Sequence, residues 1–230
     1  MTGHDETATR LPVVVELRRY TLHPGRRDTL IDLFERELVT PQEACGMRLL
    51  GRFRDLDVPD RFVWLRGFPG MEARRQALAG FYGGPAWRRH RDAANATMID
   101  SDDVLLLRPV LDPADADATD AGVAAGAEVI GVVCRFDAPV DPAVPLHFRQ
   151  RLWPRFAAAG AALLGVFASE YASNDFPALP VRQGEHVFAW FARVPVWDDG
   201  MRAAWHADAP PQRPREREVM RLRPTAGSPW

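Results

Sequence analysis

Two segments of the chain place charged and aromatic side chains at every second position, the spacing that puts them on one face of a β-strand. In residues 13–20 these side chains are Glu16, Arg18 and Tyr20. In residues 61–68 they are Phe62, Trp64, Arg66 and Phe68. Arginine presents a fixed fork of N–H donors to carboxylate or carbonyl oxygens, and aromatic walls bury the rest of a small ligand. If the two faces meet, they predict a site for an anionic or carbonyl-bearing small molecule.

In such a site Arg18 and Arg66 would hold and polarise the substrate, while Tyr20 or His90 would move protons. His90 shares one stripe of a predicted helix with Trp87, and the unperturbed pKa of a histidine lies near neutrality. The same imidazole could instead ligate haem iron, or it could be packed at a helix–sheet boundary. The glutamate and arginines also have a structural alternative, a buried ion pair that fixes sheet register.

Composition excludes several classes of site. All 29 basic residues are arginine, which rules out Schiff-base catalysis by lysine and a P-loop. Neither Cys45 nor Cys134 has metal-ligand spacing around it, and none of His147, His186 and His206 has a His or carboxylate at ligand spacing, so no metal site is expected. A net charge of −2 gives no field that would attract nucleic acid. There is no apolar run long enough for a membrane span and no apolar leader, so we expect a cytoplasmic protein.

The elements that must position these residues follow from hydrophobic periodicity. In the first half, strands are predicted at residues 13–20, 47–53, 61–68 and 103–108, and helices at 27–38 and 71–82, with a helical restart after Gly83-Gly84-Pro85. The order is βαββαβ, which is typical of a ferredoxin-like unit.

The second half repeats the first. Three sequence matches occur in the same order in both halves: residues 46–53 with 160–167, 62–65 with 188–191, and 107–109 with 222–224. The second unit is predicted to have strands at 129–136, 163–171, 186–194 and 218–222, and helices at 142–159 and 198–207, the first kinked at Pro154. The domain organisation is therefore a unit at 12–111, an Ala/Asp-rich linker at 112–127 and a diverged unit at 128–224. Residues 225–230 are expected to be loose.

We predict an α+β fold in which the two ferredoxin-like units pack as an intramolecular α/β barrel, because each sheet has one face that its own helices leave uncovered. In the aligned second unit Trp190 takes the place of Trp64, but Ala192 replaces Arg66. The sequence therefore predicts one asymmetric pocket in a central cavity, polar on the wall of the first unit and apolar on the wall that carries Trp190.

Four segments resemble the NIPSNAP family: residues 16–25, 61–68, 85–88 and 100–109. The resemblance implies membership of the dimeric α/β-barrel superfamily, in agreement with the predicted order of elements. Its members include cofactor-independent oxygenases, isomerases, cyclases, haem enzymes and proteins without known catalysis, so the resemblance implies no single chemistry.

Two function hypotheses of different class follow, with a third behind them. The first is an enzyme of the isomerase, cyclase or oxygenase kind that acts on a carbonyl or aromatic metabolite in the barrel cavity without a cofactor, with Tyr20, Arg66 and His90 as catalytic residues. The second is a non-catalytic binding or interaction protein. The third is a haem-dependent enzyme. A small molecule is the expected partner, and the sequence leaves a homodimer of such barrels, the substrate and the reaction open.

Overall fold

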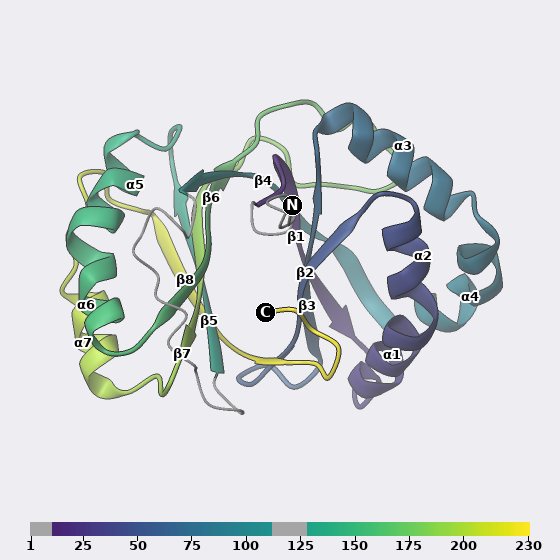
Figure 1. The fold of residues 1–230 in the computed structure, drawn as a ribbon, viewed down its shortest axis with the longest axis horizontal. Helices are drawn as coiled ribbons and strands as arrows, with labels where there is room; N and C mark the ends of the chain where they lie inside the picture. The colour runs from purple at the N-terminus through teal and green to yellow at the C-terminus, as the bar shows by residue number, and fades with distance from the viewer. Residues whose placement is uncertain (1–10, 112–127) are drawn as a thin grey trace, which may run out of the picture.

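A computed structural model describes residues 11–111 and 128–230 of the chain, so the predicted linker at 112–127 lies outside the described residues. Each half has the predicted βαββαβ order (Figure 1). The first unit comprises β1 (Val14–Leu22), α1 (Arg27–Leu33), the π-helical turn η2 (Phe34–Leu38), α2 (Val39–Ala44), β2 (Arg48–Asp55), β3 (Arg61–Phe68), α3 (Met71–Tyr82), α4 (Pro85–Asn95) and β4 (Met98–Leu111). The second comprises β5 (Glu128–Phe136), α5 (Ala143–His147), the π-helical turn η4 (Phe148–Leu152), α6 (Trp153–Ala158), β6 (Ala162–Ser169), β7 (His186–Val194), α7 (Asp199–His206) and β8 (Glu216–Pro224).

The predicted kink of the second unit's long helix takes the form of a π-helical turn just before Pro154. The first unit has a matching turn, Phe34–Leu38, shortly before Pro41. A proline has no N–H to donate to the helix ladder, and a π turn widens the ladder at that point. The two units therefore carry a π-helical turn at equivalent places.

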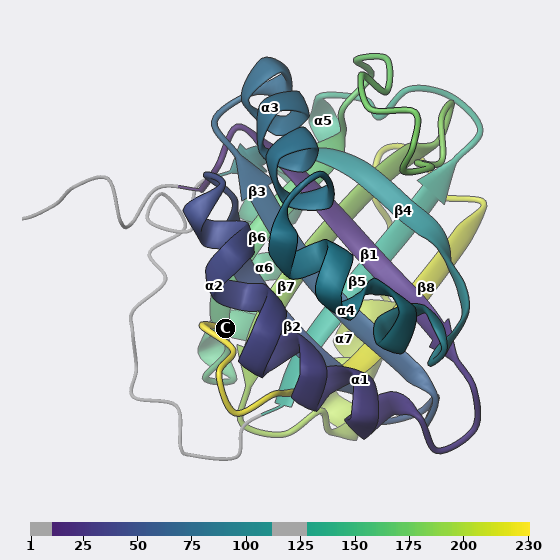
Figure 2. The same cartoon turned by 90° about the vertical axis from the view of Figure 1, so that its right-hand side faces the viewer.

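The strands form one closed antiparallel barrel in the order β1-β3-β2-β8-β5-β7-β6-β4. Each unit contributes four adjacent strands, and the units join at two short seams. At one seam Phe53–Asp55 pairs with Leu222–Pro224, and at the other β4 pairs with β6 between Leu107 and Leu111. Helices α1–α4 cover the outer face of the first unit, as Figure 2 shows, and α5–α7 cover that of the second. The predicted α+β barrel is thereby confirmed.

The barrel interior is a packed core. Buried apolar side chains from all eight strands meet there: Val15, Leu17, Leu50, Phe53, Val63, Leu65, Leu105, Leu107, Val129, Val133, Phe167, Val187, Ala189, Phe191, Met220 and Leu222. An eight-stranded barrel is just wide enough for side chains to fill it. These side chains fill the middle of the barrel, so the expected ligand cavity does not lie there. Towards one end the same inward alternation continues with charged residues, where Glu218 pairs with Arg19, Arg61 and Arg135.

The C-terminal residues also contradict the expectation of a loose tail. Trp230 packs against the barrel core, with its ring centroid 6.4 Å from that of Phe167 and 5.8 Å from that of Phe191. The tail is held along β2, where Thr225 donates its backbone N–H to the carbonyl of Arg52 at 2.9 Å. In Figure 1 the C-terminus lies between the two sheets.

Candidate functional site

The polar residues of β1 face the helices and not the barrel interior. Val15 and Leu17 point inward to the core, so the alternating residues Glu16, Arg18 and Tyr20 point outward, under α2 and α3. On β3 the same alternation sends Trp64 and Arg66 outward beside them, since Arg18 pairs with Trp64 and Glu16 with Arg66. The sequence correctly grouped these residues on one face, but that face belongs to the sheet–helix layer of the first unit.

Glu16 is the centre of this layer. Its Oε2 accepts hydrogen bonds from Nη1 of Arg18 and Nε of Arg66, both at 2.8 Å, and its Oε1 accepts one from Nε of Arg74 at 2.7 Å. The side chains of all four residues are at most 1% exposed. Burial by itself would raise the pKa of Glu16, but the three guanidinium groups outweigh it and hold that pKa far below its usual range. Glu16 is therefore a fixed carboxylate anion that orients three arginines.

The three arginines carry more positive charge than the buried carboxylate of Glu16 neutralises. Three guanidinium groups surround one fully buried carboxylate, and the Nη2 atoms of Arg66 and Arg74 are buried without a hydrogen-bond partner among the described residues. A buried donor on a charged group is costly to leave unpaired. Each of these two Nη2 atoms can therefore bond one further oxygen atom, of a water molecule or of a ligand.

Arg74 is the residue of the cluster that sequence reasoning missed. It lies on α3 with Ala77, Leu78 and Phe81, and all four side chains are buried. The sequence contains a signal for this. Arg74 is position i of a helical stripe whose positions i+3, i+4 and i+7 are apolar, and an arginine on such a stripe faces the core and needs a partner there.

Aromatic rings line the guanidinium group of Arg66. Its Cζ lies 5.1 Å from the ring centroid of Trp64 and 5.8 Å from those of Phe68 and Tyr82. Its Nη1 donates to Oε1 of Gln42 at 3.1 Å and lies 3.5 Å from the hydroxyl of Tyr82. The predicted combination of arginine and aromatic wall is therefore present, with Tyr82 as an addition that the sequence did not single out.

The phenol of Tyr20 is placed to donate a hydrogen bond. Nε of Arg18 donates to its hydroxyl oxygen at 3.0 Å, which leaves the hydroxyl proton free to point elsewhere. Burial raises the pKa of Tyr20 above its ordinary value, so the phenol remains protonated at neutral pH. Phe62 packs edge-on against this ring at 6.4 Å between centroids.

A loop from the second unit completes the cluster. Nη1 of Arg74 donates to Oδ1 of Asp175 at 2.6 Å and to Oδ1 of Asn174 at 3.2 Å. The next residue, Phe176, stacks on Tyr82 with ring centroids 6.1 Å apart. No periodic signal marks such residues in a sequence, because their position depends on how the loop between β6 and β7 crosses the barrel.

Of the two helical candidates on α4, only Trp87 reaches this layer. Its ring lies 5.0 Å from that of Tyr82, edge to face. His90 lies elsewhere, with its Nε2 3.5 Å from Oε2 of Glu37 and its side chain 20% exposed. The structure therefore brings Tyr20 and Arg66 together but leaves His90 apart from them.

Trp190 does not share a pocket with the arginines. It packs in the other sheet–helix layer, against Phe148, Phe156 and Trp205 of the second unit. The predicted pocket with a polar and an apolar wall is wrong, because the two walls are outer faces on opposite sides of the barrel. Cys134 lies in the same apolar layer, where burial raises the pKa of its thiol to about 12.

Three of the histidines among the described residues have polar neighbours. Two histidines are already engaged, His147 with Asp208 at 2.7 Å and His186 with the hydroxyl of Tyr171 at 2.9 Å. His90 lies beside Glu37 at the helix surface. Within the described part of the chain no three His, Cys, Asp or Glu side chains gather as metal ligands, and no helix is long and apolar enough to cross a membrane.

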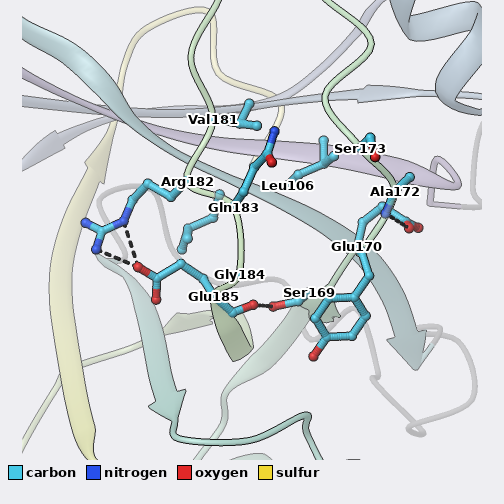
Figure 3. Close-up of a pocket in the computed structure, with 12 residues that line it drawn as sticks. Leu106, Ser169, Glu170, Ala172, Ser173, Val181, Arg182, Gln183, Gly184 and Glu185 are labelled. Atoms are coloured by element: carbon cyan, nitrogen blue, oxygen red, sulfur yellow. Dashed lines mark hydrogen bonds and ion pairs between the residues drawn. The ribbon is translucent and has the colours of Figure 1, made fainter. Parts of the chain in front are cut away.

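The loop between β6 and β7 also covers a pocket of about 220 Å³, drawn in Figure 3. Leu105 and Leu106 of β4 form one wall, and residues 169–173 and 181–185 form the rest. Its polar groups are partly engaged with one another, since Arg182 pairs with Glu185 at 2.6 Å and the hydroxyl of Ser169 donates to the carbonyl of Glu185. The loop therefore spans an open space at its base and the arginine cluster at its tip.

Comparison with known proteins gives one family. The NIPSNAP family model matches residues 15–112. A NIPSNAP-like domain protein from Burkholderia xenovorans is 27% identical over 43% of this chain and 85% of its own, with a TM-score of 0.40. No curated protein matches the chain.

Solved structures also resemble the chain over nearly its full length, and two of them follow. A putative monooxygenase from Lactobacillus acidophilus is 14% identical over 93% of this chain and 94% of its own, with a TM-score of 0.50. A mutant chlorite dismutase from Candidatus Nitrospira defluvii, in complex with cyanide, is 11% identical over 97% and 96%, with a TM-score of 0.52. At these identities the likeness shows the barrel fold alone.

Proposed function

We propose that the protein, whose residues 15–112 match the NIPSNAP family model, is an enzyme acting on a small carbonyl or aromatic metabolite. Its site is the sheet–helix layer of the first unit, between Glu16, Arg18, Arg66 and Arg74. The observation that carries the proposal is the pair of buried, unpartnered Nη2 atoms on Arg66 and Arg74. Two such donors, already charged and fixed by Glu16, suit an oxygen on which negative charge develops during a reaction.

The fold also supports this proposal, as a weaker argument by analogy. The putative monooxygenase and the chlorite dismutase named above share the barrel over their full lengths. Their chemistry differs, and neither reaction is assigned to this chain.

The chemical roles follow from the geometry. Arg66 and Arg74 would bind the substrate's oxygen and stabilise its charge, with Trp64, Phe68 and Tyr82 against its apolar body. Tyr20 would donate its proton, since its hydroxyl oxygen is already held by Arg18. Glu16 would position the arginines and would not act as a base, because its pKa is held far below neutrality.

The test is loss of turnover in Tyr20→Phe. The purified protein is incubated with a panel of aromatic ketones, keto acids, quinones and aryl carboxylates, and substrate loss is followed by mass spectrometry. Removing one hydroxyl should lower kcat by about 100-fold or more while KM changes only a few-fold. Thr21→Val is the control for loss of a hydroxyl from β1, because Thr21 is exposed and lies outside the cluster. Equal turnover by the wild type and Tyr20→Phe would overturn the role of Tyr20.

Substitution of Arg66 is a poorer test of the proposed function than substitution of Tyr20. Arg66 is fully buried and bound to Glu16, Gln42 and Tyr82. Removing one partner of a buried ion pair costs about 3–5 kcal/mol, so Arg66→Leu would lower stability as well as activity.

A non-catalytic binding protein is the second candidate. It is favoured by the fact that Glu16 already accepts hydrogen bonds from all three arginines, which leaves no free carboxylate base in the layer. In that case a ligand from the panel raises the melting temperature without turnover, and Tyr20→Phe leaves this shift unchanged.

A further inference from the structure

The loop between β6 and β7, residues 170–185, belongs to the second unit by sequence but to the first by its contacts. The equivalent connection in the first unit, between Asp55 and Arg61, is a short turn. The long loop is tied to β4 at both of its ends, because the N–H groups of Glu170 and Arg182 donate to the carbonyls of Leu106 and Val104 at 2.9 Å. In Figure 1 it crosses, in green, from β6 toward α3.

The tip of this loop places a carboxylate and an aromatic ring side by side on the arginine cluster. Asp175 reaches Nη1 of Arg74 at 2.6 Å. Phe176 stacks on Tyr82 with an interplanar angle of 30°. Tyr82 is also the ring that lies over the guanidinium group of Arg66. Two consecutive loop residues therefore supply a negative charge to the cationic centre and an aromatic face to its wall.

These are the groups that a small aromatic carboxylate would bring to the same site. Asp175 satisfies only Nη1 of Arg74, and the Nη2 atoms of Arg74 and Arg66 stay unpartnered. A free carboxylate is not tied to a loop backbone, and its two oxygens could pair with both guanidinium groups in the forked geometry that arginine favours. Such a ligand would replace the contacts of the loop and add the two that it lacks.

The ion pair of Asp175 and the packing of Phe176 and Leu179 hold the loop against the first unit. Asp175 itself has 24% of its side chain in solvent. Tyr171, Ala172 and Ser173, which precede the tip, are exposed. The pocket of Figure 3 lies beneath them, so this part of the loop rests over open space instead of packed core. Lifting the tip would break the contacts of Asp175, Phe176 and Leu179 with the first unit but would leave the interior of the barrel packed.

We propose that Asp175 and Phe176 are an internal stand-in for the ligand, and that the loop at residues 170–185 opens to admit a small aromatic carboxylate onto Arg74, Arg66 and Tyr82. The inference rests on the proposed location of the site but goes further, because it names the chemical class of the ligand and the segment that excludes it. The closed loop competes with the ligand, so the apparent affinity of the wild type is lowered by the fraction of molecules that are closed.

The experiment measures binding of benzoate, phenylacetate and 3-phenylpropionate by isothermal titration calorimetry. The proteins are the wild type, Asp175→Asn, Phe176→Leu and the control Asp137→Asn. Asp137 is 83% exposed and lies 3.9 Å from Arg215, so its substitution changes the net charge equally without touching the cluster. We expect Asp175→Asn to lower the Kd of at least one probe tenfold or more, Phe176→Leu to lower it less, and Asp137→Asn to leave it unchanged. The corresponding amides should bind at least tenfold more weakly.

The inference is overturned if none of the three carboxylates binds Asp175→Asn or Phe176→Leu while circular dichroism shows both variants folded. It is also overturned if the wild type and Asp175→Asn bind with equal Kd. Failure of the proposed function gives a different result. If Asp175→Asn gains affinity but no compound is turned over, the result supports the gated binding site and contradicts the proposed enzymatic activity. If a ketone is turned over in a Tyr20-dependent way while Asp175→Asn gains no affinity for the carboxylates, the result supports the proposed enzymatic activity and contradicts the gate.

Discussion

At the scale of single residues, Glu16 determines the order of the buried layer. Three arginines from β1, β3 and α3 would repel one another in a water-excluded space without a shared counter-charge. Glu16 binds each of them through a side-chain nitrogen, and it leaves one Nη2 on Arg66 and one on Arg74 unused. The same carboxylate therefore stabilises the fold and keeps two donors available for a ligand.

Glu16→Gln should lower the free energy of unfolding by about 3–5 kcal/mol at neutral pH, because it leaves buried arginines without their counter-charge. The pKa of Glu16 is depressed in the folded protein, so its contribution is complete above the unfolded pKa of about 4.3 and is lost as pH falls below it. Urea unfolding at pH 7, 5, 4 and 3 checks this. The gap between wild type and variant should be constant from pH 7 to 5 and should then narrow.

A gap that stayed unchanged down to pH 3 would show that Glu16 is not held in its ionised form by the arginines. Glu72→Gln is a suitable control. Glu72 lies on the surface of α3 and binds Arg75, and solvent screens surface pairs of this kind, so they contribute little to stability.

At the scale of elements, each unit has a β-bulge at the same strand position, next to aromatic rings. Register shifts occur at Gly51 in β2 and at Gly165 in β6. A methyl group at Gly165 would lie 2.6 Å from Cζ of Phe167 and 3.3 Å from Cη2 of Trp230, and one at Gly51 would collide with Phe53 and lie 3.2 Å from Cε3 of Trp230. The indole of Trp230 is therefore held between two equivalent glycines.

Gly51→Ala and Gly165→Ala should each lower the free energy of unfolding by about 1–3 kcal/mol, because the added methyl group overpacks a filled interior. Chemical denaturation measures the change. Gly70→Ala is the matched control, since nothing lies within 4 Å of its added methyl group. If all three variants unfolded at the same denaturant concentration, the close packing around Trp230 would be refuted.

At the scale of the whole molecule, neither unit can cover the inner face of its own sheet. The interior core takes side chains from both halves, and the seams between them are only a few residue pairs long. Most of the stabilisation between the units therefore comes from apolar burial and not from strand pairing.

A fragment of residues 11–111 should consequently not persist as a folded monomer. It exposes the inner face formed by Val15, Leu17, Val63, Leu65 and Leu105, which the second unit buries in the whole chain. We expect the fragment to dimerise, closing a barrel with a second copy of itself, or else to aggregate. Light scattering after size-exclusion chromatography distinguishes these states, with the whole chain as the reference. A stable folded monomer would show that the inner face needs no partner.

The amino-acid sequence by itself determined the order of the elements in both units, the residues that share a strand face, and the barrel. Strand and helix periods are local, so Glu16, Arg18 and Tyr20 could be grouped from their spacing alone. The same alternation could not say which face looks inward, because both faces of a central strand in this fold are buried. That ambiguity is the reason the arginines were expected inside the barrel.

Only the tertiary structure decided which partners meet these residues. Asp175, Phe176 and Trp230 reach their contacts from the far half of the chain. Their positions depend on the closure of the barrel and on the path of a loop and a tail without periodic structure. Arg74 is an intermediate example, because the apolar stripe of its helix indicates its burial from the sequence but not its partners. Its partners Glu16 and Asp175 became known only when helix, sheet and loop were packed together.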